Sequence, residues 1–227
     1  MSSTHHDLEE HGHEGVKPSA EAERYAVRIR AIEALLVEKS ILAEGDVRRQ
    51  IEYMEVRSPI NGAKLVARAW IDPGFKASLL SDTKAAALEL GIDASGPVEF
   101  VTVENTPEVH NLIVCTLCSC YPRAILGRPP DWYKSFNYRS RAVNEPRAVM
   151  REFGLEIPED INKVAVHDSS ADVRYLVLPM RPPGTEGMGE EELAGLVTRD
   201  CLIGVSTPSF EGARAGAPGT ANPVPRR

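Results

Sequence analysis

The sequence lacks the features that mark several large classes of protein. Its 227 residues contain 4 cysteines, too few for the dense disulfide framework of a small secreted domain. No apolar run approaches the ~20 residues of a membrane-spanning helix, and the N-terminal MSSTHHDLEEHGHEG has no signal-peptide core. Acidic residues outnumber basic ones, 33 to 26, which argues against a nucleic-acid-binding face. We therefore expect a globular protein of the reducing cytoplasm that binds neither nucleic acid nor membranes.

The two ends of the chain differ from its middle in composition. Residues 1–19 hold histidines among acidic residues, and residues 212–227 are rich in alanine, glycine and proline. Because neither segment has the apolar residues that a core needs, we predict two disordered tails. The histidines would also suit a tail that gathers metal loosely, since neutral imidazoles bind transition metals.

Residues 20–92 have the apolar spacing of amphipathic helices. Tyr25, Ile29, Ile32 and Leu36 recur at three- and four-residue steps. Glycine and proline then divide the segment into further helices. The expected helices cover residues 20–43, 46–56, 59–71 and 73–90. Together they would form a helical arm that packs on its own domain or on a partner subunit.

Residues 93–211 mix strands and helices without a regular βαβ rhythm. We predict strands at 98–103 and 112–114, a loop at 123–130, and helices at 140–153 and 190–196. Segments 163–167 and 173–178 both alternate apolar and polar residues around Asp168–Asp172, which predicts a β-hairpin. Helices first and mixed elements afterwards predict the α+β class, with an α/β domain following the arm.

Three of the four cysteines lie within six residues, in the sequence VCTLCSC. Cys115 and Cys118 form a C-x-x-C pair that can chelate one ion from a tight turn, and Cys120 adds a third sulfur. The backbone amides of Ser119 and Cys120 lie within reach of the same ion. This loop can therefore offer three sulfurs and two nitrogens, which leaves one coordination position open for a substrate.

Other kinds of cysteine site fit the spacing less well. A closed zinc site needs a fourth ligand, and His110, His167 and Cys201 do not stand at finger-like spacings. An iron–sulfur cluster usually takes four cysteines, and a thioredoxin-like redox pair has no use for a third. Adjacent thiols oxidise readily, so an inert buried cluster is a poor explanation. A metal carrier that is inactive alone remains a separate hypothesis.

The cysteine cluster and five further blocks resemble one family. Val114–Cys120 resembles the metal-claw motif of nitrile hydratase α subunits, and equally that of thiocyanate hydrolase γ subunits. The resemblance covers about residues 24 to 208. The other blocks stand in the same order, and they are Asn61–Pro73 (NGAKLVARAWIDP), Glu104–His110 (ENTPEVH), Pro129–Lys134 (PPDWYK), Asp168–Tyr175 (DSSADVRY) and Gly184–Gly187 (GTEG).

The resemblance implies a fold and a metal. The fold is a helical arm that wraps a partner, followed by a layered α-β-β-α domain with the claw at the subunit interface. Thr116 matches the cobalt-type claw, which implies one trivalent cobalt per chain. Its ligands would be the sulfurs of Cys115, Cys118 and Cys120 and the amide nitrogens of Ser119 and Cys120.

The resemblance also implies that two of the claw cysteines are oxidised after translation. Cys118 would become a sulfinic acid and Cys120 a sulfenic acid, two rungs of the thiol oxidation ladder. Their oxygens need cationic partners. In the family these come largely as arginines from the partner subunit, and Arg174 is the candidate from this chain.

The implied reaction is hydration of a nitrile to the amide. Trivalent cobalt is a Lewis acid that polarises a nitrile or activates water. The attack would come from water or from the sulfenate oxygen of Cys120, with Ser119 hydrogen bonding near the claw. The implied partners are one or two β-type subunits, a metallochaperone and the small substrate.

Two positions resemble the thiocyanate branch of the family. Arg123 stands where typical two-subunit nitrile hydratases carry tryptophan, and Cys201 lies in a block, Val197–Gly204, that looks like the thiocyanate enzyme. A cation beside the claw would favour an anionic substrate. Residues 132–142 look closer to nitrile hydratases. We therefore expect the α subunit of a cobalt nitrile hydratase of the three-subunit, toyocamycin type, with a thiocyanate hydrolase γ subunit, converting thiocyanate to carbonyl sulfide and ammonia, as the alternative.

Overall fold

The computed structural model describes residues 20–55, 57–158, 161 and 163–210. The predicted tails, 1–19 and 212–227, lie outside these residues. The chain divides into two compact units, with the boundary between Glu52 and Tyr53. We describe each unit by itself.

The first unit contains α1 (Ala20–Glu38) and most of α2 (Asp46–Glu55). Helix α1 ends earlier than residue 43, because Ser40 adopts a left-handed conformation with φ of 56°. The carboxylate of Asp46 then accepts a hydrogen bond from the Ala43 N–H at 2.7 Å, which holds the turn before α2. Of the apolar residues that predicted α1, Tyr25, Ile29 and Ile32 are exposed and Leu36 is half-buried.

The second unit begins with three helices that the sequence had placed in the arm. They are α3 (Pro59–Ile71), α4 (Pro73–Ser81) and α5 (Thr83–Glu89). Leu65 and Leu79 are fully buried in the same core as the strands, so the boundary falls after Glu52 and not after residue 92. Residues 73–90 are two helices rather than one, because Asp82 takes an extended conformation and its side chain caps α5 through the Ala85 N–H at 3.0 Å.

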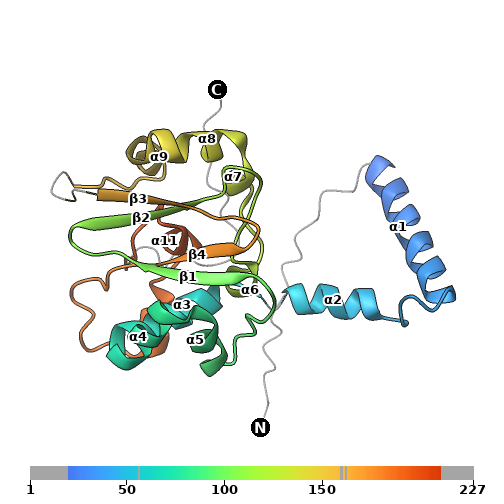
Figure 1. Ribbon diagram of the computed structural model, residues 1–227, viewed down its shortest axis with the longest axis horizontal. Coiled ribbons are helices and arrows are strands. Elements are labelled where there is room, and N and C mark those ends of the chain that lie inside the picture. The colour runs from blue at the N-terminus through green and yellow to red at the C-terminus, as the bar shows by residue number, and fades with distance from the viewer. Residues whose placement is uncertain (1–19, 56, 159–160, 162, 211–227) are drawn as a thin grey trace, which may run out of the picture. The chain divides into compact units, whose positions relative to one another are not determined.

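Two parallel strand pairs form the centre of this unit (Figure 1). Strand β1 (Glu99–Glu104) pairs with β4 (Val173–Leu178), and β2 (Val109–Val114) pairs with β3 (Lys163–Asp168). The predicted β-hairpin is therefore wrong. Alternation of apolar residues is the same in a hairpin and in a parallel pair, and here β3 and β4 belong to different sheets.

Strand β2 begins at Val109, earlier than predicted. The sequence pattern missed its first part because that part contains polar residues. His110 and Asn111 are buried, and their hydrogen-bonding groups are satisfied within the protein. The Asn111 N–H donates to Asn105 Oδ1 at 2.8 Å, and His110 Nε2 lies 2.8 Å from the Gly204 carbonyl oxygen. Gly204 is required there, since its φ is 95° and a Cβ would lie 2.0 Å from the Asn111 carbonyl oxygen.

Short helices complete the second unit. The predicted loop at 123–130 contains one helical turn, and the predicted helix at 140–153 breaks at Glu145 before Pro146, which cannot donate the next helical hydrogen bond. The helix at Glu190–Gly195 was predicted, whereas the helix at Arg199–Ile203 was not. These helices are α6 (Arg123–Leu126), α7 (Asp131–Lys134), α8 (Phe136–Asn144), α9 (Pro146–Glu152), α10 (Glu190–Gly195) and α11 (Arg199–Ile203).

The elements form the expected α-β-β-α layers. Helices α4 and α5 contact β1, the two sheets contact each other, α8 contacts β2, and α9 contacts β3 (Figure 1). The predicted α+β class is confirmed. Within the described residues, no helix is both long and apolar enough to cross a bilayer.

Candidate metal centre

The cysteine cluster lies in the loop that follows β2. Val114 is the last residue of that strand, and the next residue, Cys115, is fully buried. The loop then turns outward, so that Cys118 is exposed and Cys120 is half-buried. The sulfur atoms of Cys115 and Cys118 are 3.6 Å apart, and those of Cys118 and Cys120 are 3.2 Å apart. All three sulfurs lie within 4.8 Å of one another, which is close enough to share one metal ion.

Backbone amides point into the same cluster. The Cys118 N–H donates to Cys115 Sγ at 3.3 Å. The amides of Ser119 and Cys120 lie close enough to Cys118 Sγ to lower the pKa of that thiol. The turn therefore gathers three sulfurs around one point, with these two amides beside them. We call residues 115–120 the claw.

The thiols of Cys118 and Cys120 do not ionise alike. Hydrogen bonds from the Cys120 and Cys115 thiols, and then from the Ser119 and Cys120 amides, lower the pKa of Cys118 to about 7. Burial, and then the neighbouring Cys118 and Cys115 sulfurs, raise the pKa of Cys120 to about 12. The cluster therefore carries its first negative charge on Cys118, and a second thiolate needs a cation beside it. A transition metal supplies that charge, and three thiolates with deprotonated amides are a donor set that such ions accept.

The first half of the claw is clamped from two other elements. Val114 and Asp168, the last residues of β2 and β3, are paired in register. This pairing lets the Asp168 carboxylate accept from Thr116 N–H at 2.9 Å and from Thr116 Oγ1 at 2.5 Å. Arg139, from α8, donates to the Thr116 carbonyl oxygen at 3.2 Å. All three polar groups of Thr116 are therefore fixed by residues outside the claw.

The second half of the claw is held by a tyrosine. Tyr133 is fully buried, and its hydroxyl donates to the Cys120 carbonyl oxygen at 2.9 Å. Burial raises the pKa of Tyr133 well above its ordinary value, so the hydroxyl keeps its proton. The claw is thus fixed at both ends by side chains that are not candidate ligands.

The two arginines singled out from the sequence differ in position. Arg174, in β4, is half-buried, and its positive charge partly offsets the burial that raises the pKa of Cys120. Arg123 opens α6 and is exposed. Among the described residues, its side chain makes no hydrogen bond or ion pair with the claw. Arg174 therefore acts on the claw through its charge, whereas the exposed Arg123 stays a prediction from the sequence.

The residues considered as a fourth zinc ligand are engaged elsewhere. His110 bonds the Gly204 carbonyl, and His167 Nε2 lies 2.8 Å from Asn111 Oδ1. Cys201 is buried with its sulfur 3.1 Å from Thr198 Oγ1. Among the described residues, the metal-binding group around the claw consists of three cysteines. A closed tetrahedral zinc site therefore does not form from this set.

Sequence reasoning missed Asp168, Tyr133 and Arg139 as contacts of the claw. Asp168 was read as the start of a hairpin turn, although the parallel register places it beside the claw. Tyr133 and Arg139 come from helices whose faces cannot be oriented from the sequence. A weak signal for Tyr133 was its place in the PPDWYK block, which shared the order of the claw's family.

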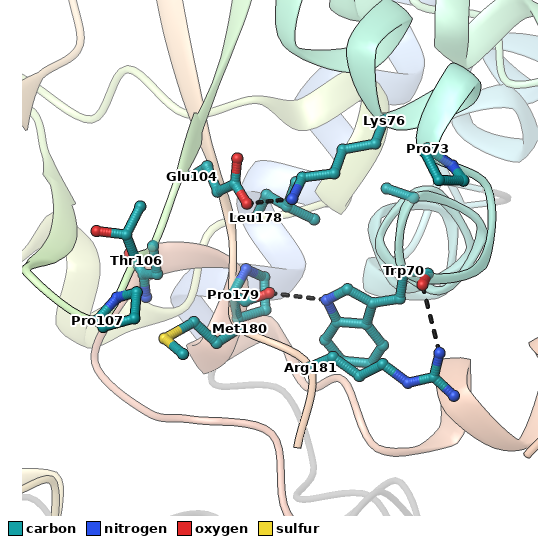
Figure 2. A pocket seen from close by; sticks show the side chains of 12 residues that line it. Trp70, Pro73, Lys76, Glu104, Thr106, Pro107, Leu178, Pro179, Met180 and Arg181 are labelled. Atoms are coloured by element: carbon teal, nitrogen blue, oxygen red, sulfur yellow. Dashed lines mark hydrogen bonds and ion pairs between the residues drawn. The ribbon is translucent and has the colours of Figure 1, made fainter. Parts of the chain in front are cut away.

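A surface cavity of about 390 Å³ lies elsewhere, at the ends of β1 and β4 (Figure 2). Trp70, Lys76, Glu104 and Arg181 line it, and no claw residue does. Its polar groups are already paired within the protein. Lys76 pairs with Glu104, the Trp70 indole N–H donates to the Pro179 carbonyl at 2.8 Å, and Arg181 donates to the Trp70 carbonyl at 3.3 Å. The cavity is therefore separate from the candidate metal centre.

Comparison with known proteins identifies similar chains. The family model described as the nitrile hydratase alpha chain matches residues 23–206. The alpha subunit of the low-molecular weight cobalt-containing nitrile hydratase of Rhodococcus rhodochrous is 50% identical over 188 residues, covering 82% of this chain and 90% of that one. The gamma subunit of thiocyanate hydrolase of Thiobacillus thioparus is 42% identical over 189 residues, covering 78% of this chain and 77% of that one. A solved recombinant thiocyanate hydrolase with partially modified cobalt centres matches with a TM-score of 0.78 and 37% identity, covering 89% of this chain and 96% of that one.

Proposed function

Because the chain belongs to the nitrile hydratase α-chain family, we propose that it is the metal-bearing subunit of a nitrile hydratase, which adds water to a nitrile to give the amide. The observation that carries this proposal is the three-sulfur claw, with sulfurs within 4.8 Å and both of its ends fixed. A site that is fixed at both ends by side chains outside it is suited to metal catalysis rather than to loose metal storage.

The proposed metal is one trivalent cobalt per chain. The sulfurs of Cys115, Cys118 and Cys120 and the amide nitrogens of Ser119 and Cys120 would hold it. When bound, it supplies a Lewis acid at a position open to the nitrile or to water. Relatives named as cobalt-containing, and Thr116 in the claw, support this choice.

Cys118 and Cys120 are proposed to act as sulfinic and sulfenic acids. Cys118 is exposed and carries the first negative charge of the cluster, two properties that favour oxidation of a thiol. The oxygens added to these sulfurs carry negative charge, and Arg174, whose charge acts on the Cys120 thiol, would be one cationic partner from this chain. Arginines of a partner subunit would complete the pairing.

The reaction balances as addition of one water molecule. The water oxygen bonds to the nitrile carbon, one proton passes to nitrogen, and tautomerisation of the imidic acid moves the second. On this route the Cys120 sulfenate oxygen would accept a proton from the attacking water. On the alternative route the sulfenate oxygen would attack the carbon, and water would then attack the Cys120 sulfur, breaking the S–O bond and restoring the sulfenate, so that the net change is again addition of one water. The side chain of Ser119, itself part of the claw, would form a hydrogen bond close to the metal position. Arg123, which is exposed, would contact a polar substituent of the substrate.

The proposed assembly contains one or two β-type subunits, and a metallochaperone would load the ion in the cytoplasm. Relatives of this chain are named as subunits, and the exposed apolar residues of α1 are suited to cover by another chain. The nitrile reading is preferred over thiocyanate because identity is 50% to the nitrile hydratase subunit and 42% to the thiocyanate subunit. Cys201, one of the two signals for thiocyanate, packs in the core.

The test is an assay of the complex with its β-type partners after growth with cobalt. We expect one cobalt per chain, hydration of a heteroaromatic nitrile such as 3-cyanopyridine, and added oxygens on the peptide that contains Cys118 and Cys120. The Cys120→Ser variant should be inactive, whereas Cys201→Ala should retain activity. Turnover of thiocyanate alone would overturn the nitrile reading. Bound zinc with unoxidised cysteines would overturn the cobalt claw.

A further inference from the structure

We propose that Tyr133 is a positioning residue for the claw, and that its hydroxyl sets the orientation of Cys120 through the Cys120 carbonyl. The proposal rests on the proposed function, because it takes Cys120 as a metal ligand. It assigns a role to a residue that is neither a ligand nor a group in contact with the substrate.

The Tyr133 ring is held in one place by its surroundings. It has no exposed surface, and it lies in the four-residue helix α7. Three aromatic rings surround it, with centroids at 5.1 Å for Tyr121, 6.0 Å for Trp132 and 5.6 Å for Tyr138. A ring packed on several sides has one available orientation, so the position of its hydroxyl is determined by the fold.

The direction of the hydrogen bond follows from the groups involved. A carbonyl oxygen can only accept, so the Tyr133 hydroxyl donates to Cys120 over the 2.9 Å that separates them. The side chain of Ser169, which is also buried, lies close enough to this hydroxyl to influence its pKa. The hydrogen bond itself runs in one direction, from Tyr133 to Cys120.

The two ends of the claw are held by different elements. At the start, the Ser169 N–H donates to the Val114 carbonyl at 2.7 Å, and the residue before it, Asp168, accepts from Thr116. At the end, the Tyr133 hydroxyl holds the Cys120 carbonyl. Loss of the Tyr133 hydroxyl would leave the Cys120 carbonyl without this donor and would free the peptide that follows Cys120, while the ring packing stays.

The chain offers a matched control in Tyr138. It belongs to the same aromatic cluster, is buried, and donates its hydroxyl to a backbone carbonyl, that of Ile113, at 2.6 Å. Ile113 lies in β2 and is not a candidate ligand. Tyr138→Phe therefore removes a comparable buried hydrogen bond without touching Cys120. Any general loss of stability should appear in both variants.

The experiment compares Tyr133→Phe and Tyr138→Phe in the cobalt-loaded complex with its partner subunits. The readouts are the sulfur-to-cobalt charge-transfer absorption, the rate of cobalt loss to a chelator, and kcat and KM for a nitrile. For Tyr133→Phe we expect a shifted absorption band, and cobalt loss and kcat changed roughly 10- to 100-fold, with KM nearly constant. Tyr138→Phe should keep the wild-type band and kcat.

An unchanged band and kcat in Tyr133→Phe would overturn the proposal, and so would equal changes in both variants. If Tyr133→Phe does not fold, 3-fluorotyrosine at position 133 decides, because it changes the donor strength of the hydroxyl and leaves a ring of nearly the same size in place. A band shift with 3-fluorotyrosine supports the proposal, and an unchanged band overturns it. A wild-type complex that hydrates no nitrile would refute the proposed function, while the band and the cobalt loss would still decide on Tyr133.

Discussion

Asp168 accepts two hydrogen bonds from a single residue of the claw, one from the Thr116 backbone N–H and one from its hydroxyl. The two residues are 52 positions apart in the sequence. They meet because β2 and β3 are parallel and end at the same level. The claw is therefore shaped by the sheet as well as by its own tight turn.

Replacing Asp168 by asparagine should loosen the claw. An amide has one oxygen, so one of the two Thr116 donors would face an NH2 group instead of an acceptor. We expect cobalt retention to fall roughly tenfold, measured by metal analysis after dialysis against a chelator. Asp172→Asn, in the same connection, is the control and should retain cobalt as the wild type does. Equal retention in both variants would contradict the clamp.

The stability of the chain should fall as the solution is made more acidic than the ordinary histidine pKa of 6.5. Burial lowers the pKa of His110, and burial and then Lys163 lower that of His167. Below pH 6.5 the unfolded chain therefore binds protons that the folded chain does not, and folding weakens until the pH reaches the lowered values. For His110 the cost is up to about 1.4 kcal/mol per pH unit, and for the half-buried His167 solvent screening makes it smaller.

Urea unfolding from pH 7.5 to pH 5 measures this effect. The His110→Gln variant should show a flatter dependence of the unfolding free energy on pH than the wild type. The Gly204 carbonyl remains available to the glutamine side-chain amide, so the comparison isolates the titration. A wild-type stability that is constant or rises toward pH 5 would refute the assignment of a neutral, buried His110.

Gly204→Ala should be strongly destabilising. The residue has a φ of 95°, and the added Cβ would lie 2.0 Å from the Asn111 carbonyl oxygen, which belongs to β2. The left-handed conformation costs ~1–2 kcal/mol, and relief of the clash costs about 1–3 kcal/mol more. Gly154 separates the two effects, because its φ is 82° and nothing lies within 4 Å of its Cβ. Gly154→Ala should therefore lose about 1–2 kcal/mol. Similar losses in both variants would show that the close approach at Gly204 has no effect.

Asp82→Ala should weaken the junction of α4 and α5. The side chain accepts the Ala85 N–H at 3.0 Å, and this bond starts the second helix. Loss of such a cap costs about 1 kcal/mol of unfolding free energy. Asp82→Asn keeps an acceptor oxygen and should retain most of the stability. The measurement is chemical denaturation, and an alanine variant as stable as the asparagine variant would contradict the capping role.

The sequence predicted best those features that depend on neighbouring residues. Helix α3 was predicted to the residue because Pro59 starts it and Asp72 and Pro73 end it. The claw was readable because its sulfurs come from consecutive positions of one turn. Strand pairing was not readable, since alternation in β3 and β4 fits a hairpin and a parallel pair equally well. The roles of Asp168 and Tyr133 depend on that pairing and on helix orientation, which only the tertiary structure defines.

The parallel pairing of β2 and β3 has a consequence for the order of events during synthesis. Thr116 can be clamped only after Asp168 has emerged from the ribosome and β3 has docked beside β2, a long-range pairing that forms slowly compared with local helices. Until then, the three cysteines are a flexible thiol segment with no defined geometry. Metal should therefore be inserted after translation, into a chain that has already folded, and a nascent chain should not compete for the ion.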